Sequence, residues 1–239
     1  AIRLLYERAG ALSNAQGDTG TLTLIGTVSP AGGNFDEPVT QGTLNTVKTF
    51  LGLSYARAYK RFYPAVDPLI SWSRYVDQLA PWFREQLGAE WRGRTERLKQ
   101  LLREGDEIQR MMQVTGEEGI SDADFLTQQK AQLIDMVYLQ QDAFDPVDVS
   151  TPLTRQKTMI ALLSRLVDAP LTGADKQAIR SLFARFTDLL RNLNYAAADS
   201  DTYQQYLQRI ETLLRETTSL KRPPEPHNAG VAVDKSAET

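Results

Sequence analysis

The stretch from Gly42 to Thr49 comes close to a pattern that binds nucleotide phosphates. It reads Gly-Thr-Leu-Asn-Thr-Val-Lys-Thr, whereas a phosphate-binding loop reads Gly-x-x-x-x-Gly-Lys-[Ser/Thr]. Val47 stands where the second glycine is needed, and its Cβ would crowd the backbone against a phosphate. We interpret the match as chance. Phosphoryl transfer needs a phosphate cradle and a magnesium ligand, so this chain is not expected to hydrolyse ATP alone.

Two aromatic residues could instead stack on a planar ligand. Tyr63 precedes Pro64, and a proline restricts the residue before it to extended conformations, which predicts a ring held rigidly at a turn. The second candidate is Phe144, directly after Ala143. Stacking of a base on an aromatic side chain contributes about 1–3 kcal/mol. Taken alone, however, a Tyr-Pro and an Ala-Phe pair favour ordinary core aromatics.

Acidic side chains gather where two helical patterns are interrupted by Gly116 and Gly119. Nothing in the pattern predicts a cleft around these carboxylates, so we do not interpret them as an acid/base pair. Acids also favour the first turn of a helix, where the helix dipole stabilises negative charge. This structural explanation stays open beside a role in contacting a partner. We call the group the acidic turn, and its members are Glu117, Glu118, Asp122 and Asp124.

Composition excludes several classes of function. The chain has 239 residues, a net charge of −3, no cysteine and one histidine, His227, in a polar tail. Thiol nucleophiles and thiolate metal sites are therefore impossible within it, and a histidine-based triad is not expected. Without a broad basic field, nucleic acid is not an expected partner. No run approaches the roughly 18 apolar residues of a membrane span, so we expect a cytoplasmic protein without direct membrane insertion.

The first part of the chain combines short helices with strands. The apolar spacing from Ile2 to Ala9 is that of a helix already under way, which predicts further sequence upstream. Thr21–Val28 alternates threonine with apolar residues and predicts a strand largely buried in a sheet. The elements expected next are a short helix capped by Thr40 or Thr43, a strand over Thr49–Leu53 and a helix from Ser54 to Arg61.

From Ser71 the apolar spacing becomes that of helices and stays so to about Leu220. Ser121, with Asp124 three residues later, predicts the capped start of one long helix to Gln141. Thr151-Pro152 predicts a cap followed by a first-turn proline, and Thr172 and Asp175 open a further helix. The expected helices follow Ser71, Trp91, Ser121, Thr151, Thr172 and a point shortly before Tyr203.

Three stretches carry a resemblance to a known family. They are Ser29–Thr40 (Ser-Pro-Ala-Gly-Gly-Asn-Phe-Asp-Glu-Pro-Val-Thr), Tyr63–Leu69 (Tyr-Pro-Ala-Val-Asp-Pro-Leu) and Tyr138–Asp148 (Tyr-Leu-Gln-Gln-Asp-Ala-Phe-Asp-Pro-Val-Asp). The first and third resemble segments of the catalytic A subunit of vacuolar-type and archaeal-type rotary ATPases, and the second resembles the adenine-pocket turn of the related F-type β subunit. Roughly Ala1 to Val167 resembles the C-terminal part of such a subunit, while the last two helices match in type only.

The resemblance implies a nucleotide-base pocket. Tyr63 would face the adenine ring at the turn made with Pro64, Phe144 would face it from the opposite side, and Gln141 and Ala143 would line the same wall. ATP or ADP with Mg²⁺ would be the cofactor. In the family, the phosphate-binding loop, the water-activating carboxylate and the magnesium-binding aspartate lie N-terminal to this region, so no catalytic residue or metal ligand is expected here.

The resemblance also implies partners. Phe35, Asp36 and Glu37 would shape the contact with a neighbouring B subunit of the alternating A3B3 ring, although a plain structural turn explains this loop nearly as well. The acidic turn stands where F-type β subunits have an acidic helix-turn-helix that pushes on the rotating stalk. Central stalk subunits are therefore expected partners, in a complex that couples ATP to H⁺ or Na⁺ movement and places this subunit peripheral to the membrane.

Taken together, these observations predict a mainly α fold. Residues 1–70 would form the small α/β edge of a nucleotide-binding domain, residues 71–220 a helical bundle and residues 221–239 a disordered tail. The leading hypothesis is the C-terminal segment of a rotary ATPase catalytic subunit. The alternative is a non-catalytic helical interaction module, derived from such a subunit, that docks onto partners and does not contact nucleotide.

Overall fold

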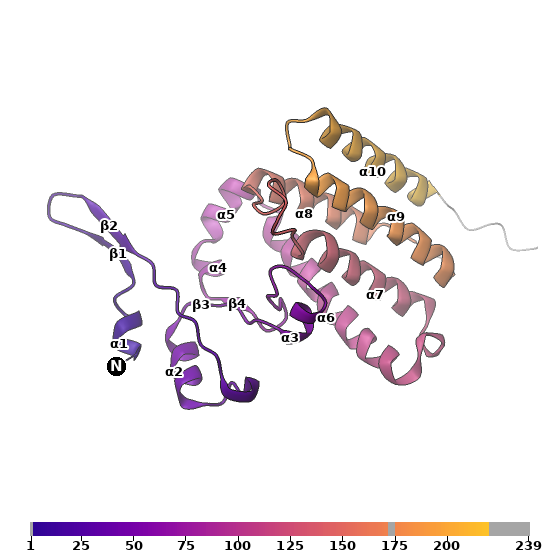
Figure 1. The fold of residues 1–239 in the computed structure, drawn as a ribbon. Coiled ribbons are helices and arrows are strands. Elements are labelled where there is room, and N and C mark those ends of the chain that lie inside the picture. Colours follow the sequence, from indigo (N-terminus) through magenta and orange to yellow (C-terminus); the bar gives the residue numbers. More distant parts are fainter. Residues whose placement is uncertain (1, 172–174, 220–239) are drawn as a thin grey trace, which may run out of the picture.

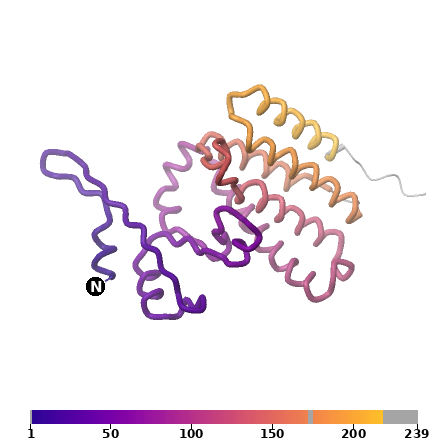
Figure 2. Tube along the Cα trace, in the orientation of Figure 1, coloured from indigo at the N-terminus to yellow at the C-terminus, as the bar shows by residue number. Residues whose placement is uncertain are grey.

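The computed structural model describes residues 2–171 and 175–219. The predicted tail from Lys221 and the predicted helix start at Thr172 lie outside these ranges. Within them the fold is mainly helical, with two small two-stranded sheets in the first third of the chain and a bundle of longer helices beside them (Figure 1). This confirms the predicted fold class. The Cα trace shows an N-terminal arm that extends away from the bundle (Figure 2).

The N-terminal arm is a helix followed by an exposed hairpin. Helix α1 (Ile2–Tyr6) precedes strands β1 (Gly10–Ser13) and β2 (Thr19–Leu22), which pair antiparallel. The prediction of a buried strand over Thr21–Val28 is wrong, because only its first two residues belong to β2 and Ile25 is 90% exposed. A strand is buried only when neighbouring strands and a covering layer exist, and within the described residues the hairpin has neither.

The next helix begins earlier than its sequence predicts. Helix α2 (Pro38–Thr46) starts at its proline, and Thr40 and Thr43 are buried inside it rather than capping it. The reason is that a proline at the first helical position has a φ angle already suited to the helix. The stretch Gly42–Thr49 therefore runs from helix α2 into strand β3. It is not a loop that leads into a helix, which agrees with a chance match to the phosphate-binding pattern.

A second small sheet connects the arm to the bundle. Strand β3 (Thr49–Phe50) pairs antiparallel with β4 (Trp72–Ser73), so the helical region begins a few residues after the predicted Ser71. Ser54 caps α3 (Tyr55–Tyr59) as predicted, because its side chain accepts a backbone N–H three residues on. The helix ends before Arg61, whose φ of 59° lies in the left-handed region and cannot continue a right-handed helix.

The bundle consists of long helices that pack around one core. Helix α6 packs against α7 and α8, α9 packs against α7 and α10, and α5 packs against α6 and α8. Their bounds are α4 (Tyr75–Gln78), α5 (Ala80–Leu87), α6 (Trp91–Thr115), α7 (Asp122–Ile134), α8 (Leu153–Asp168), α9 (Lys176–Tyr195) and α10 (Asp201–Ser219).

The core of the bundle is formed by the apolar stripes that the sequence predicts. Each of the four C-terminal helices contributes side chains with almost no exposure to solvent. Burying a leucine, isoleucine or phenylalanine side chain stabilises the folded state by about 1.5–3 kcal/mol relative to leaving it exposed. The most buried members include Phe125 of α7, Leu163 of α8, Phe186 and Leu190 of α9 and Ile210 of α10.

Two of the predicted helix caps are present in the structure. The Ser121 hydroxyl accepts the Asp124 N–H (3.1 Å), and Asp175 caps α9 by accepting the Ala178 N–H (2.7 Å), so both predicted caps are confirmed. The predicted single helix to Gln141 is wrong, because the α-helix ends at Ile134. It continues as one π-helical turn over Asp135–Leu139 (η3).

The start of α8 also differs from its prediction. The helix begins at Leu153, so Pro152 occupies the N-cap and is not a first-turn residue. Thr151 does not cap the helix with its side chain. Its hydroxyl oxygen instead accepts a hydrogen bond from the Gln141 side-chain amide (3.3 Å), and its carbonyl accepts one from Gln156 Nε2 (2.9 Å). The Thr151 hydroxyl, which the local pattern assigns to the helix cap, is therefore used by Gln141 instead.

Tyr138, in the π turn, makes the stability of the chain sensitive to high pH. Burial raises the pKa of its phenol from 10.0 to about 12. The unfolded chain therefore loses this proton first as pH rises, so the folded state is expected to lose up to about 3 kcal/mol between the two pKa values. Urea denaturation at about pH 9 and about pH 11 tests this, with Tyr138→Phe predicted to lose less stability over that interval. Equal losses in the two proteins would contradict it.

Candidate functional site

Hydrogen bonds at the end of the π turn join three distant segments. In a continuous α-helix the Gln141 N–H would donate to the carbonyl of Val137, four residues earlier. It donates instead to the Tyr63 carbonyl (2.5 Å), and the Val137 carbonyl accepts from Asn194 Nδ2 (2.7 Å). The turn that carries Tyr63, the loop after the π turn and the end of α9 therefore meet. Single π turns occur often at functional sites.

A partly buried ion pair strengthens the same junction. The Arg57 guanidinium of α3 donates to Asp135 Oδ1 (2.7 Å) at the start of the π turn, and both side chains are largely shielded from solvent. The guanidinium also lies over the ring of Phe62, 4.5 Å from its centroid. These contacts hold helix α3 and the following turn against the end of α7, so the position of Tyr63 depends on the bundle.

A cavity of about 430 Å³ lies where these segments meet. Four predicted base-pocket residues line it, namely Tyr63, Gln141, Ala143 and Phe144. The fifth, Pro64, is joined to Tyr63 by a cis peptide bond and is not among the lining residues. The structure thus brings residues from two distant stretches of sequence to one open cavity.

The two aromatic rings of the cavity are available to a ligand. Phe144 is 97% exposed, so its interpretation as a core aromatic is wrong. Tyr63 is 48% exposed, so about half of its surface is available to a ligand. Within the part of the chain that the structure describes, neither ring stacks on another aromatic side chain. Exposed aromatic faces on an open cavity suit the stacking of a flat, neutral ring.

The loop that carries Phe144 is held by its own aspartates. Asp142 Oδ1 accepts the Phe144 N–H (2.9 Å), and Asp148 Oδ2 accepts the Asp142 N–H (2.6 Å). Asp145 Oδ1 accepts the N–H of Asp148 (2.8 Å). Burial raises the pKa of Asp148, and the hydrogen bond from Asp142 opposes that rise. Gln141 Nε2 donates to the Asp148 carbonyl (3.1 Å), so the loop is tied together from both ends.

Sequence reasoning missed the contribution of helix α9 to the cavity. Arg191, Asn194 and Tyr195 line it, and the Tyr195 hydroxyl donates to Asp142 Oδ2 (3.4 Å). Arg191 and Tyr195 stand four residues apart, so they share one helix face, and this spacing is the only local signal of their association. Arg61 also lines the cavity, and among the described residues neither it nor Arg191 forms an ion pair.

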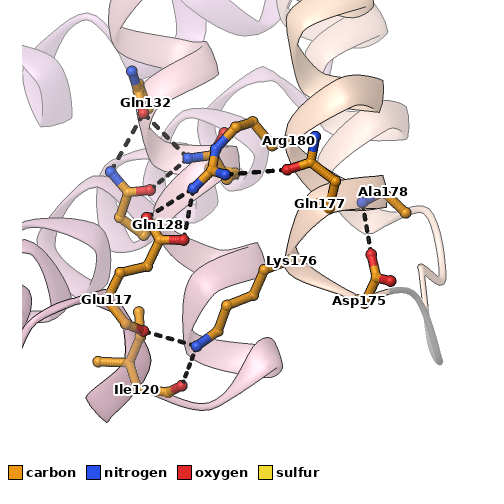
Figure 3. A network of polar contacts seen from close by, with 10 residues as sticks. Glu117, Ile120, Gln128, Gln132, Asp175, Lys176, Gln177, Ala178 and Arg180 are labelled. Atoms are coloured by element: carbon orange, nitrogen blue, oxygen red, sulfur yellow. Dashed lines mark hydrogen bonds and ion pairs between the residues drawn. The ribbon is translucent and has the colours of Figure 1, made fainter.

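The acidic turn contains two kinds of carboxylate. The Glu117 carboxylate accepts two hydrogen bonds from Arg180 (2.6 and 2.7 Å), and Asp124 Oδ2 accepts the Ser121 hydroxyl (2.7 Å) (Figure 3 shows the Arg180 contact). Glu118 and Asp122 are exposed, and neither has a side-chain partner within the described ranges. A contact with another protein would therefore involve the latter two more directly.

The predicted partner loop is an ordered turn. It contains a short 3-10 helix (η1, Ala31–Gly33), after which the Phe35 ring packs edge-on against Phe50 at 5.9 Å. Asp36 is exposed, and Glu37 accepts the Thr40 hydroxyl (2.8 Å) at the start of α2. These contacts explain the shape of the loop, and its role in contacting a B subunit stays a prediction.

Two further features concern metal ions and membranes. Residues 2–171 and 175–219 contain no group of three or more His, Cys, Asp or Glu side chains placed to hold a metal ion. None of the helices in these ranges has the length and apolar character needed to cross a membrane.

Comparisons with known proteins assign the chain to a family. The model of the ATP synthase alpha/beta family nucleotide-binding domain matches residues 1–73, and that of the C-terminal domain of V and A type ATP synthase matches residues 80–183. The V-type ATP synthase alpha chain of Chlamydia pneumoniae is 44% identical over 216 residues, which cover 90% of this chain and 36% of that protein. The corresponding protein of Protochlamydia amoebophila is 42% identical over 211 residues, covering 88% and 35%.

A solved structure supports the fold. A unique ATP synthase subunit, NeqB, from Nanoarcheaum equitans aligns with a TM-score of 0.56 and 20% sequence identity, over 71% of this chain and 39% of that chain. At this identity the likeness concerns the fold alone. The chain spans about a third of the length of the curated relatives named above. From the two family models and these relatives, the chain belongs to the V-type ATP synthase alpha chain family, within the larger ATP synthase alpha/beta family.

Proposed function

We propose that this chain forms the base pocket and the stalk-contacting helical domain of a catalytic A subunit, also called the alpha chain, which couples ATP turnover to H⁺ or Na⁺ movement. The observation that carries the proposal is the cavity shared by Tyr63, Gln141, Ala143 and Phe144. These residues come from two stretches that are far apart in sequence, and the Gln141 to Tyr63 backbone hydrogen bond holds them together.

The cavity fits a purine base better than a phosphate. Two exposed aromatic side chains, Tyr63 and Phe144, line it, and a flat neutral ring gains stacking energy from such faces. Asp142 and Asp148 line it together with Arg61 and Arg191, so the two acidic and two basic side chains balance and the lining has no excess positive charge to select a phosphate. In this proposal the chain binds and orients the base of ATP or ADP. The Mg²⁺ ion and the phosphates, which provide the phosphoryl chemistry when bound, are held by other parts of the subunit.

The proposal also names partners and a location. Phe35, Asp36 and Glu37 contact a neighbouring B subunit in the alternating ring, and the exposed Glu118 and Asp122 of the acidic turn face central stalk subunits. Exposed carboxylates that have no side-chain partner within residues 2–171 and 175–219 suit a contact with basic side chains of another protein. The subunit then lies on the cytoplasmic side, peripheral to the membrane, and is anchored through the complex.

Nucleotide affinity of the full-length subunit tests the pocket. The Tyr63→Ala and Phe144→Ala substitutions each remove one stacking face, so each is expected to weaken ATP binding about 5- to 150-fold, the equivalent of about 1–3 kcal/mol. The matched variants Tyr63→Phe and Phe144→Tyr keep an aromatic ring and are expected to bind ATP as the unsubstituted subunit does. Titration with a fluorescent ATP analogue, competed with ATP, measures all four.

The same experiment separates the two candidate functions. If both alanine variants bind ATP as tightly as their aromatic counterparts, the pocket assignment is wrong. That result would favour the alternative of a helical module that docks onto partners without contacting nucleotide.

A further inference from the structure

Helix α9 contacts both places that the proposed function uses. It spans 20 residues, which corresponds to a length of about 30 Å. Lys176 and Arg180, in its first turns, contact the acidic turn (Figure 3), whereas Asn194 and Tyr195, in its last turn, line the base cavity. The apolar side chains that pack α9 into the bundle make neither of these contacts. The helix therefore has a polar attachment at each end.

The first attachment clamps the acidic turn. Lys176 Nζ donates to the carbonyls of Glu117 (2.7 Å) and Ile120 (2.8 Å), which are the first residue and the C-cap of the short 3-10 turn η2 (Glu117–Gly119). Arg180 donates to both carboxylate oxygens of Glu117. Exposed ion pairs of this kind add little stability, so the consequence of the clamp is geometric. Two cations on α9 fix the orientation of the turn relative to the helix.

The second attachment joins α9 to the π turn and, through the Tyr195 hydroxyl on Asp142, to the loop that carries Phe144. Asn194 Nδ2 donates to the Val137 carbonyl, the group released when the π turn redirects Gln141 toward Tyr63. Arg155, which is only 6% exposed, donates to the carbonyls of Leu193 and Asn194 and so satisfies the open C-terminal end of α9. The end of the helix cannot shift without disturbing bonds to the cavity wall.

The middle of α9 is packed tightly enough for its two ends to move together. Ile179, Phe183, Phe186, Leu190 and Leu193 are all buried along one face of the helix. Close-packed interiors transmit displacements because they contain few voids that could absorb them. This packing provides a rigid connection between the cavity wall and the first turn of α9.

We propose that α9 carries changes at the base cavity to the acidic turn, with Lys176 and Arg180 as positioning residues of that turn and Asn194 as the link to the cavity wall. This inference rests on the proposed function and adds a route between its two sites. Arg180 acts on the acidic turn through Glu117 and does not touch nucleotide. Removing it should uncouple the turn without changing the cavity.

A fluorescent probe on the acidic turn tests the route in the full-length subunit. The chain has no cysteine, and Val114 is 87% exposed just before the turn, so Val114→Cys gives one labelling position in this part of the subunit. Mg²⁺–ATP is expected to change the fluorescence of the label. In Arg180→Met the change is expected to fall about fivefold while ATP affinity stays the same, because the coupling between the sites is lost. Arg180→Lys should restore part of it.

Arg165→Met is the matched control. Arg165 forms a comparable two-bond ion pair with Glu211, between α8 and α10, and has no bond to the acidic turn. It is expected to keep the full fluorescence response. Lys176→Met, which removes the donor to the two turn carbonyls, is a second test in case Arg180→Met folds poorly, and it should also reduce the response.

The outcomes distinguish this inference from the function on which it rests. Equal responses in Arg180→Met and Arg165→Met, or no response to ATP in a subunit that binds it tightly, would overturn the route through α9 and leave the base pocket intact. The proposed function fails by a different measurement, namely if Tyr63→Ala and Phe144→Ala leave the ATP affinity unchanged.

Discussion

An alanine at position 105 is expected to destabilise the bundle by about 1–3 kcal/mol, because it overpacks the contact between α6 and α7. Gly105 is a buried residue of α6, and a Cβ added to it would lie 2.2 Å from the Ala131 Cβ and 3.7 Å from the Ala131 Cα. One of these atoms is a backbone carbon of α7 and the other is the Cβ attached to it. No rotamer change can move either atom, so the contact cannot be relieved in that way. The helices would have to move apart.

This result is the opposite of the usual effect of the substitution. In an exposed helix interior, replacing glycine by alanine stabilises the helix by up to about 1 kcal/mol. Gly93 provides the control, because it lies in the same helix and an added Cβ would meet no atom within 4 Å. Gly93→Ala should therefore be neutral or stabilising. Urea denaturation followed by circular dichroism measures both variants.

A compensating substitution makes the test sharper. Ala131→Gly removes the atom that the new methyl group would strike, so the Gly105→Ala, Ala131→Gly pair should recover much of the stability lost in Gly105→Ala alone. Coupling of this kind is expected only for residues in direct contact. If Gly105→Ala proves as well tolerated as Gly93→Ala, the close approach of α6 and α7 is wrong.

Phe186→Ala is expected to cost about 3–5 kcal/mol, the largest loss among the substitutions considered. The side chain is 1% exposed, lies on the buried face of α9 and packs against the ring of Phe183 with their centroids 6.4 Å apart. Truncation removes the buried ring and leaves a cavity that the helices packed against α9, which include α7 and α10, cannot fill without moving. A loss of this size is a large part of the stability of a typical domain.

The neighbouring Arg185 provides the control for Phe186. It is exposed on the same helix, and substitution to alanine should change stability by less than about 0.5 kcal/mol. Equilibrium denaturation of the two variants gives the comparison. Similar stabilities for Phe186→Ala and Arg185→Ala would mean that the Phe186 ring is not buried in the core of the bundle.

Local sequence patterns predicted the C-terminal helices well for a physical reason. In α9, an aspartate cap at Asp175 precedes a stripe that includes Phe183, Phe186 and Leu190, and both the cap and the buried face are confirmed. Capping chemistry and 3.6-residue periodicity act over one or two turns of helix, so they are visible without tertiary information. The Ser121 cap of α7 was predicted for the same reason.

Predictions failed where a distant group determines the backbone. The helix from Ser121 does not reach Gln141, because the Gln141 N–H leaves the helix to bond the Tyr63 carbonyl. The Thr151 hydroxyl receives a hydrogen bond from Gln141 and does not cap α8. Thr21–Val28 has the alternation of a buried strand, but only a neighbouring sheet could bury it. A pattern of one segment contains no information about these partners.

The sequence by itself determined the family, the helical periods and the candidate aromatic pair of Tyr63 and Phe144, since these depend on side-chain identity and on spacing within short stretches. Only the tertiary structure decided that the two residues share a cavity and that Arg191, Asn194 and Tyr195 of α9 complete it. It also decided that Glu117 is paired internally with Arg180. Such contacts follow from helix packing, in which the whole core determines which distant residues meet.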